Sequence, residues 1–318
     1  DIYISTKTKI AYLNTSIPLH DIFWKLPVLD YSIPKNGILK KSIKINCMNE
    51  TETKELNNLI NNEKNINISI ISDLKTDKHY KDVRKIDIGI CKKDLLSYRM
   101  KKKGAFYNCF AIIMRVLFED KYKEVHIKIF NTGKLEIPGI RDEKLLHLSL
   151  NKLNEILIQL MNNDTIKYNK DNIQNVLINS NFSCGFFINR SELAKILKMK
   201  YNLQPIYDPC SYPGIQCKFY YNIQNKIHDG KCSCTNKCYF RKKKEKKVCT
   251  EVSFMIFRTG SVLIVGHCDE QVLNIVYKFI RKLLIDEHFN IAQNTSENYV
   301  KKKSIPKIRK KEILVSIK

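Results

Sequence analysis

The feature that most constrains the fold of this chain is an internal repeat whose two copies lie 127 residues apart. A segment that begins at Phe130 returns at Phe257, and both copies have the pattern Phe-x-Thr-Gly followed by five residues and a further glycine. The same offset carries an acidic pair at 142–143 onto an acidic pair at 269–270. Residues of several types thus match at one constant offset. This match predicts two copies of one structural unit, because unrelated hairpins would not share residues beyond the turn.

Each copy has the pattern of a β-hairpin followed by a helix. One strand ends at the phenylalanine, Gly133 or Gly260 supplies the positive φ of a tight turn, and a second strand ends at the next glycine. The acidic pair then stands where the N-terminus of a helix favours negative charge. Apolar residues recur after it at helical spacing, and they are Leu146, Leu150, Leu153 and Leu157 in the first copy and Val272, Val276, Phe279 and Leu283 in the second. We therefore expect two amphipathic helices, each packed on its own antiparallel sheet.

The residues upstream of the two hairpins follow a common order of strand, helix and strand. The expected segments are 2–13, 19–26 and 105–118 in the first copy, and 172–182, 191–200 and 216–221 in the second. The chain thus divides into a first repeat at 1–165 with an insertion at about 36–103, a second repeat at 166–287 with a Cys- and Lys-rich insertion at about 222–250, and a basic tail at 288–318. This organisation predicts the α+β class.

The charge of the chain indicates a polyanionic partner. Its 318 residues include 56 Lys and Arg against 32 Asp and Glu, a formal net charge of +24, and nucleic acid is a better candidate than an anionic membrane surface. No apolar window approaches the ~18 residues of a membrane span, so we expect a soluble protein without a membrane partner. Eleven cysteines without regular disulfide spacing favour reduced thiols and an intracellular location.

Short segments in both repeats carry a resemblance to a known family. They are the two hairpins together with residues 112–116, 173–175, 207–209 and 212–215. On these segments the chain resembles the TATA-box-binding protein family, from about residue 2 to residue 285. The cysteine-bearing insertion and residues 102–108 are more similar to the divergent relatives carried by large nucleocytoplasmic DNA viruses.

The resemblance implies a saddle-shaped α+β fold, in which two αβ repeats form one curved antiparallel sheet with helices on the convex face. It also implies that the concave face binds AT-rich promoter DNA in the minor groove, where apolar wedges unstack base steps and bend the duplex. Strand alternation gives separate support, because it places Phe257, Leu263 and Val265 on the sheet face away from the helices. An apolar face in a strongly basic chain suits a partner that is apolar within and anionic at its edges.

Carried over residue by residue, the resemblance implies a set of DNA contacts. The hairpin wedges are Phe130 and Phe257, and their partners are Tyr212 in the second copy and either Phe106 or Phe110 in the first. The groove-floor residues are Asn175 in the second copy and Thr6 in the first, with Thr8, Leu177, Leu263 and Val265 as neighbouring contacts. The implied partners are double-stranded DNA, general transcription factors and RNA polymerase subunits. The implied location is the nucleus or, for a viral protein, a cytoplasmic viral factory or the virion.

Three residues depart from the family pattern. Glu136 and Pro138 stand where the family has an apolar residue and Thr on the concave face, and Tyr212 stands where the family prefers Phe. Phosphates repel a carboxylate that faces the minor groove, and a hydroxyl buried without a hydrogen bond costs free energy. The alternative function is therefore a protein-interaction subunit of a transcription complex with weak or lost DNA binding.

The sequence shows no catalytic motif. It has no glycine-rich phosphate loop, no nucleophile elbow and no acid pair at a recognisable spacing, which predicts a protein that is not an enzyme. An accessory nucleic-acid-processing protein is a further alternative, because similar saddle folds occur beside glycosylase and ribonuclease domains. The two repeats, however, account for nearly the whole chain.

The second insertion holds a group of cysteines, Cys232, Cys234, Cys238 and Cys249. Four thiolates, or three with His228, would form a closed zinc site able to fold a polar loop. The spacing lacks a Cys-x-x-Cys pair, so a flexible loop with reduced thiols is an equal alternative, and no cofactor other than this structural zinc is expected. Two basic runs, at 241–247 and 301–311, fit solvated surface, phosphate contacts or nuclear localisation.

Overall fold

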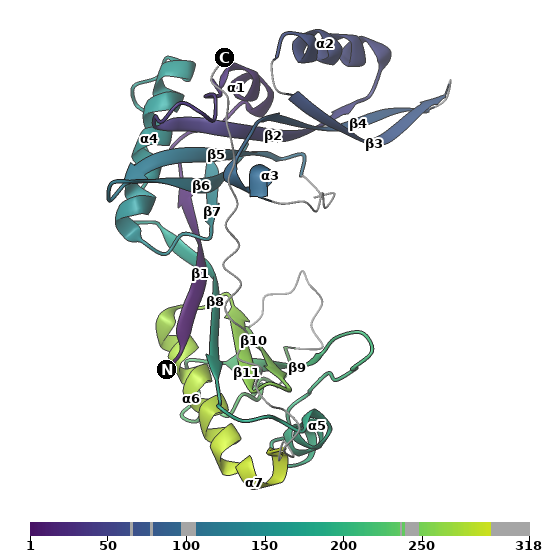
Figure 1. The fold of residues 1–318 in the computed structure, drawn as a ribbon, viewed down its shortest axis with the longest axis vertical. Helices are drawn as coiled ribbons and strands as arrows, with labels where there is room; N and C mark the ends of the chain where they lie inside the picture. The colour runs from purple at the N-terminus through teal and green to yellow at the C-terminus, as the bar shows by residue number, and fades with distance from the viewer. Residues whose placement is uncertain (64–65, 77–78, 97–105, 236, 239–247, 294–318) are drawn as a thin grey trace. The chain divides into compact units, whose positions relative to one another are not determined.

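The computed structural model describes residues 1–63, 66–76, 79–96, 106–235, 237–238 and 248–293. These residues form two compact units (Figure 1). Of the described residues, the N-terminal unit holds 9–174, and the C-terminal unit holds 1–8 together with 175–293. The first strand, β1 (Tyr3–Tyr12), begins in the C-terminal unit and ends in the N-terminal unit.

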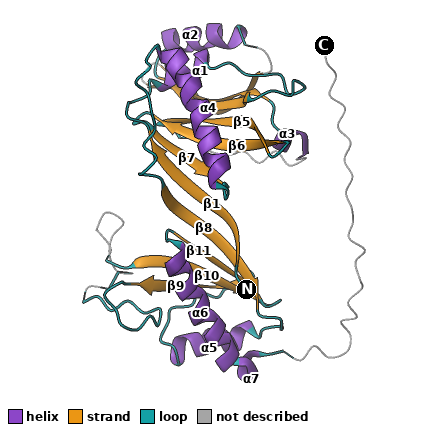
Figure 2. Ribbon diagram, turned by 90° about the vertical axis from the view of Figure 1, so that its left-hand side faces the viewer, coloured by secondary structure: helices purple, strands orange, loops and turns teal. Residues whose placement is uncertain are grey.

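The N-terminal unit is an antiparallel sheet with helices packed on it. Its further elements are α1 (Leu19–Lys25), β2 (Gly37–Cys47), α2 (Glu50–Asn61), β3 (Ile66–Thr76), β4 (His79–Gly89), α3 (Lys92–Leu96), β5 (Cys109–Phe118), β6 (Lys121–Phe130), β7 (Lys134–Pro138) and α4 (Glu143–Met161). The strand order is β3-β4-β2-β5-β6-β7-β1. Helices α1 and α4 contact β5, and Figure 2 shows α4 lying across one face of the sheet. The predicted first insertion supplies β2 to α3, and β2 pairs with both β5 and β4, so the insertion widens this sheet.

The C-terminal unit has the same arrangement with fewer strands. Its elements are β8 (Gln174–Ser183), α5 (Arg190–Met199), β9 (Gly214–Tyr221), β10 (Thr250–Phe257), β11 (Ser261–Gly266), α6 (Glu270–Asp286) and α7 (His288–Ile291). The strand order is β1-β8-β11-β10-β9. Helix α6 contacts β11 and α5 contacts β9. The predicted α+β class is confirmed. The first residues of the predicted basic tail form α7, and residues 294–318 lie outside the described residues.

The two hairpins and the helices after them follow the local chemistry of the sequence. Gly133 has φ +79° and Gly260 has φ +78°, and a Cβ at either position would lie 2.2 or 2.3 Å from a backbone carbonyl oxygen. Only glycine fits these turns. Asp142 caps α4 by accepting a hydrogen bond from the backbone N–H of Leu145, and Asp269 caps α6 in the same way.

Each unit has its own hydrophobic core between the sheet and the long helix. In the N-terminal unit Leu146, Leu153 and Leu157 of α4 are fully buried with residues of β5, β6 and β7. In the C-terminal unit Val276 and Ile280 of α6 are buried in a separate cluster. The helices therefore cover one face of each sheet. Among the described residues, no helix is long and apolar enough to cross a membrane.

Candidate nucleic-acid interface

The sheet face of the C-terminal unit that turns away from α6 carries partly exposed apolar side chains. Strand alternation buries Val262 and Ile264 of β11 in the core beneath α6. Leu263 and Val265 therefore lie on the opposite face, where both are half-buried, as expected for the predicted contacts.

The strand register extends this surface across three strands. Leu263 is paired with Met255 of β10 on one side and with Asn181 of β8 on the other. The next row contains Val265 between Ser253 and Asn179. We name this surface the C-terminal open face, and it consists of Asn179, Asn181, Ser253, Met255, Leu263 and Val265. It combines apolar groups with amides, so it offers both van der Waals surface and hydrogen-bond donors.

An aromatic pair lies at the hairpin end of the C-terminal unit. The ring centroids of Tyr212 and Phe257 are 5.9 Å apart, and both side chains are half-buried. Gly214 is paired with Phe257 across β9 and β10. A Cβ on Gly214 would lie 3.0 Å from a ring carbon of Phe257 and 3.1 Å from one of Tyr212. The glycine therefore leaves the space that these two rings occupy. The structure brings together the wedge and the partner that the resemblance implied for this copy.

Side chains of β1 and β8 contact each other in the same unit. The amide nitrogen Nδ2 of Asn179 donates a 2.8 Å hydrogen bond to Oγ1 of Thr6. Asn175, Leu177 and Thr8 are half-buried. The enclosed oxygen Oδ1 of Asn175 has no hydrogen-bond partner in the described structure. Asn175 was predicted from the sequence, whereas Asn179 and Asn181 were missed. The three asparagines are separated by an even number of positions, so strand alternation places them on one face of β8.

The corresponding face of the N-terminal unit is charged. Lys128 of β6 is paired with Glu136 of β7, and its Nζ lies 2.6 Å from Oε1 of Glu136. Phe130 is half-buried, and Nζ of Lys134 lies 5.0 Å from the centroid of its ring. The repeat offset places Lys128 at the position of Met255 and Glu136 at that of Leu263. An ion pair in one unit thus stands where the other unit has an apolar pair.

This ion pair changes the interpretation of Glu136. In the sequence, a carboxylate at this position predicts repulsion by the phosphates of DNA. In the structure Lys128 neutralises that charge on the same face. The pair as a whole adds no net charge, and its main effect is to replace apolar surface by polar surface.

The aromatic partner of Phe130 needs a correction. Phe110 is 1% exposed and packs edge-to-face on Phe23 in the core, so it is not accessible to a surface partner. Phe106, the other candidate, is 66% exposed. Cys109 is paired with Phe130 as Gly214 is with Phe257. The residue two positions before Cys109, in the place of Tyr212, is Tyr107.

Sequence reasoning missed Tyr107, because its place follows from the register between β5 and β6. The Tyr107 side chain is 51% exposed. Nζ of Lys44 lies 4.1 Å from the centroid of its ring, a cation–π distance. Tyr107 is therefore an aromatic candidate for the N-terminal face beside Phe106.

The four cysteines of the second insertion lie together. Their Sγ atoms all lie within 4.8 Å of one another. Cys232, Cys238 and Cys249 are buried and Cys234 is half-buried. Burial opposes ionisation of Cys238, but hydrogen bonds from the backbone N–H groups of Cys249 and Val248 lower its pKa to about 7. His228 is not in this group, and its ring lies 4.8 Å from that of Tyr221 between centroids.

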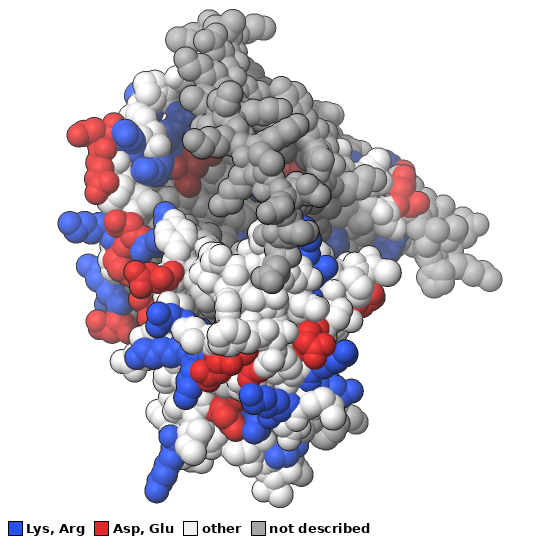
Figure 3. Space-filling model, turned by 60° about the horizontal axis from the view of Figure 1, so that its bottom comes forward, with Lys and Arg blue, Asp and Glu red and all other residues white. Residues whose placement is uncertain are grey.

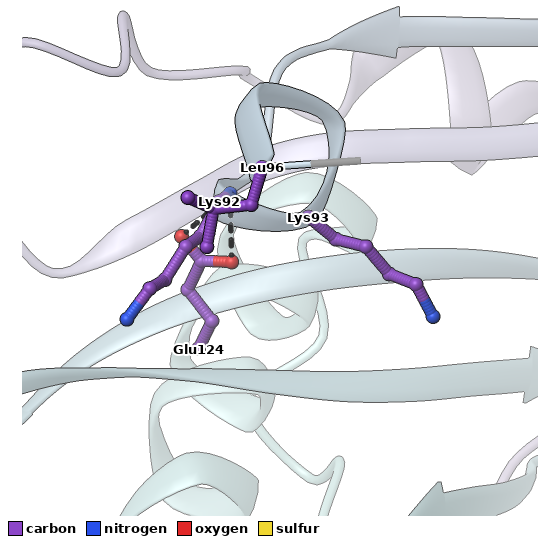
Figure 4. A pocket seen from close by; sticks show the side chains of 4 residues that line it. All are labelled: Lys92, Lys93, Leu96 and Glu124. Carbon is purple, nitrogen blue, oxygen red and sulfur yellow. Dashed lines mark hydrogen bonds between the residues drawn. The ribbon is translucent and has the colours of Figure 1, made fainter. Parts of the chain in front are cut away.

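The remaining surface features are less specific. On the face that Figure 3 shows, Lys and Arg side chains are interspersed with Asp and Glu, so no large region of one sign appears there. The basic runs at 241–247 and 301–311 lie outside the described residues. A shallow pocket beside α3 is lined by Lys92, Lys93, Leu96 and Glu124 (Figure 4). The backbone N–H of Lys92 donates to both carboxylate oxygens of Glu124 there.

These observations define an α+β protein in which each unit covers one face of an antiparallel sheet with helices and leaves aromatic residues at its hairpin end. No family model matches the chain. Over 200 residues it is 30% identical to "TATA-box-binding protein-like" of Acanthamoeba polyphaga mimivirus, an alignment that covers 58% of this chain and 50% of that protein. In sequence the chain is therefore similar to a viral protein that is named TATA-box-binding protein-like, in agreement with the resemblance drawn from its hairpins.

The extent of the match is partial. The chain spans about half the length of this curated relative. Among solved structures, one similar chain is "Methanococcus jannaschii TBP", with a TM-score of 0.42, 12% sequence identity, and coverage of 90% of this chain and 98% of that one.

Proposed function

We propose that this protein binds AT-rich double-stranded DNA through the minor groove, bends it, and acts in transcription initiation. The observation that carries the proposal is the C-terminal open face beside the Tyr212–Phe257 pair. It presents apolar and amide side chains, together with aromatic rings at one end, on a sheet face opposite the helices.

The chemistry of this face matches the minor groove of AT-rich DNA. The floor of that groove exposes only acceptors at A·T pairs, whereas G·C pairs add an amino donor. The amides of Asn179 and Asn181 offer N–H donors to such acceptors, whereas the side chains of Leu263 and Val265 offer no acceptor to a guanine amino group that meets them. The half-buried rings of Phe257 and Tyr212 suit a wedge against a base step. The face therefore favours A·T pairs where Leu263 and Val265 meet the groove floor, because a guanine amino group would be buried there without a partner.

The N-terminal face supports a weaker contribution. Its Lys128–Glu136 pair cannot desolvate as readily as Met255 and Leu263. Phe130, Phe106 and Tyr107 are the aromatic groups that a duplex would meet in this unit. The hydroxyls of Thr6 and Thr8 would add to the C-terminal unit, which also holds Asn175 and Leu177. Strong binding by the C-terminal unit and weak binding by the N-terminal unit follow.

The role in transcription rests on the sequence relationship to a protein named TATA-box-binding protein-like. We propose that the helices recruit general transcription factors and RNA polymerase subunits, and that the protein is not an enzyme. Its place of action would be the nucleus or, in a viral setting, a cytoplasmic factory. The alternative is a protein-interaction subunit with lost DNA binding, which the charged N-terminal face favours.

Fluorescence anisotropy with AT-rich and GC-rich duplexes tests the proposal. The informative variant is Asn181→Asp, which puts a carboxylate on the C-terminal open face. The matched control is Gln271→Glu, which adds the same charge to an exposed position of α6. We expect the wild type to prefer the AT-rich duplex, and Asn181→Asp to weaken that binding about tenfold more than Gln271→Glu. Equal affinity for both duplexes with equal effects of the two variants would reject this face as the DNA site.

A further inference from the structure

We propose that Cys232, Cys234, Cys238 and Cys249 bind one zinc ion as a structural tetrathiolate site. The Sγ–Sγ distances are 3.8 Å from Cys232 to Cys249, 3.6 Å from Cys234 to Cys249 and 3.8 Å from Cys238 to Cys234. A regular tetrahedron with Zn–S bonds of about 2.3 Å has edges of about 3.8 Å. These three separations match the edges of such a tetrahedron, and all four sulfurs lie within 4.8 Å of one another.

The same distances exclude a disulfide in this conformation. Bonded sulfurs are about 2.05 Å apart, well below every separation in the group. Van der Waals packing of thiols would explain one close pair, but here Cys249 lies close to two other sulfurs and Cys234 lies close to two. Four sulfurs that all lie within 4.8 Å of one another enclose a common centre.

The surroundings of the sulfurs suit thiolates. The backbone N–H of Cys238 donates to Sγ of Cys232 across 3.3 Å. Nζ of Lys237 donates to the carbonyl oxygen of Cys232 across 2.9 Å, which brings a positive charge beside the group. Both contacts offset the net negative charge of a zinc ion bound by four thiolates. Each thiol releases its proton on binding.

The donor set also indicates a structural site. Four protein ligands complete the tetrahedron and leave no position for a water or a substrate. Three of the four cysteines are buried, so the ion would be enclosed. Tetrahedral sulfur ligation is also suitable for iron, so metal identity is an outcome of the test.

The site connects the insertion to the sheet. Three ligands follow β9, and the fourth, Cys249, directly precedes β10. The cysteine cluster packs on Tyr220 of β9, whose backbone N–H donates to the carbonyl oxygen of Gly230. Between Cys238 and Cys249 the sequence carries the basic run 241–247. Zinc would thus fix both ends of this run beside the edge strand β9.

Metal analysis of the purified full chain tests the proposal without any assumption about DNA. We expect about one zinc ion per chain in the wild type. Titration of the metal-free protein with Co²⁺ should give the visible bands and the thiolate charge-transfer absorption of a tetrahedral sulfur site. Stoichiometric iron, or no stoichiometric metal, would overturn the assignment.

Variants separate the cluster from the other thiols. Cys234→Ser and Cys238→Ser should lose the zinc and the cobalt thiolate bands, whereas Cys210→Ser, an exposed cysteine outside the cluster, should keep both. Because the serine variants could fail to fold, the metal is also removed from the wild type with a chelator. We expect it to make residues 222–249 sensitive to protease while the circular dichroism of the sheet is kept. Protease resistance that is unchanged by metal removal would contradict a structural ion.

Discussion

The rings of Tyr212 and Phe257 share the space above Gly214, whose missing side chain is what allows the two centroids to lie 5.9 Å apart. The pair stands at the hairpin end of the C-terminal open face. Its geometry depends on a single backbone position, and that dependence can be tested without changing either ring.

Gly214→Val should displace both rings and impair the wedge. A Cβ would already lie 3.0 Å from Phe257, and the two methyl groups of valine add further crowding. Because the rings are half-buried and can rotate outward, we expect a small loss of thermal stability but a several-fold loss of DNA bending. Calorimetry and a fluorescence bending assay measure the two quantities. A variant that bends DNA like the wild type would show that the ring positions are not important.

The ion pair of the N-terminal face should limit DNA affinity. Replacing Lys128 by Met and Glu136 by Leu copies the apolar pair of the other unit. A partly exposed ion pair contributes only about 0–1 kcal/mol to folding, so the free energy of unfolding should change little. We expect tighter binding to AT-rich duplexes.

The converse double variant, Met255→Lys with Leu263→Glu, serves as the comparison. It should weaken binding about tenfold, because it removes apolar contacts from the stronger face. If both double variants changed the DNA affinity by the same factor and in the same direction, the proposed asymmetry between the units would be contradicted.

The C-terminal unit should lose stability at alkaline pH through Tyr201. Burial, and then the hydrogen bond from its hydroxyl to Oε1 of Glu287, raise the pKa of Tyr201 to about 12. A pKa that is higher in the folded state means that this stabilisation is complete below the unfolded pKa of about 10 and is lost as the pH rises toward 12. Chemical unfolding between pH 9 and pH 12 should show a steeper decline for the wild type than for Tyr201→Phe. Identical slopes would contradict the shift.

Metal removal should weaken DNA binding without changing its sequence preference. The run 241–247 would lose its fixed ends, and phosphate contacts carry no sequence information. We expect Cys234→Ser to lower affinity for AT-rich and GC-rich duplexes alike and to reduce the salt dependence by about one or more phosphate contacts. A change in the ratio of the two affinities would indicate that the insertion contacts bases. Unchanged DNA affinity in Cys234→Ser would reject a role of the run 241–247 in DNA binding. It would not reject the zinc site, which the metal analysis tests separately.

Much of the fold could be predicted because its signals are local. The hairpins at Gly133 and Gly260 and the caps at Asp142 and Asp269 depend on residues a few positions apart. The placement of Phe130 and Phe257 at the strand ends could be predicted because both residues directly precede those turns, and their role as wedges stays a prediction. Leu263 and Val265 followed from the alternation along one strand.

The remaining parts of the site depend on pairing between strands, which one sequence does not contain. Phe110 was excluded only by its burial in the core, and Tyr107 was found only from the pairing of Cys109 with Phe130. The partner of Glu136 required the register of β6 and β7. The choice between a group of four cysteines and one of three with His228 required coordinates, because the spacing allowed both.

Bending of an AT-rich duplex, measured by energy transfer between dyes at its two ends, tests the central claim most directly. The comparison sets Phe257→Ala, Phe130→Ala and the double variant against the wild type and Lys195→Ala, an exposed helix control. We predict strong bending by the wild type and by the control variant. Bending should fall greatly in Phe257→Ala and less in Phe130→Ala, and it should be absent in the double variant. Bending by the double variant equal to that of the wild type would contradict the account.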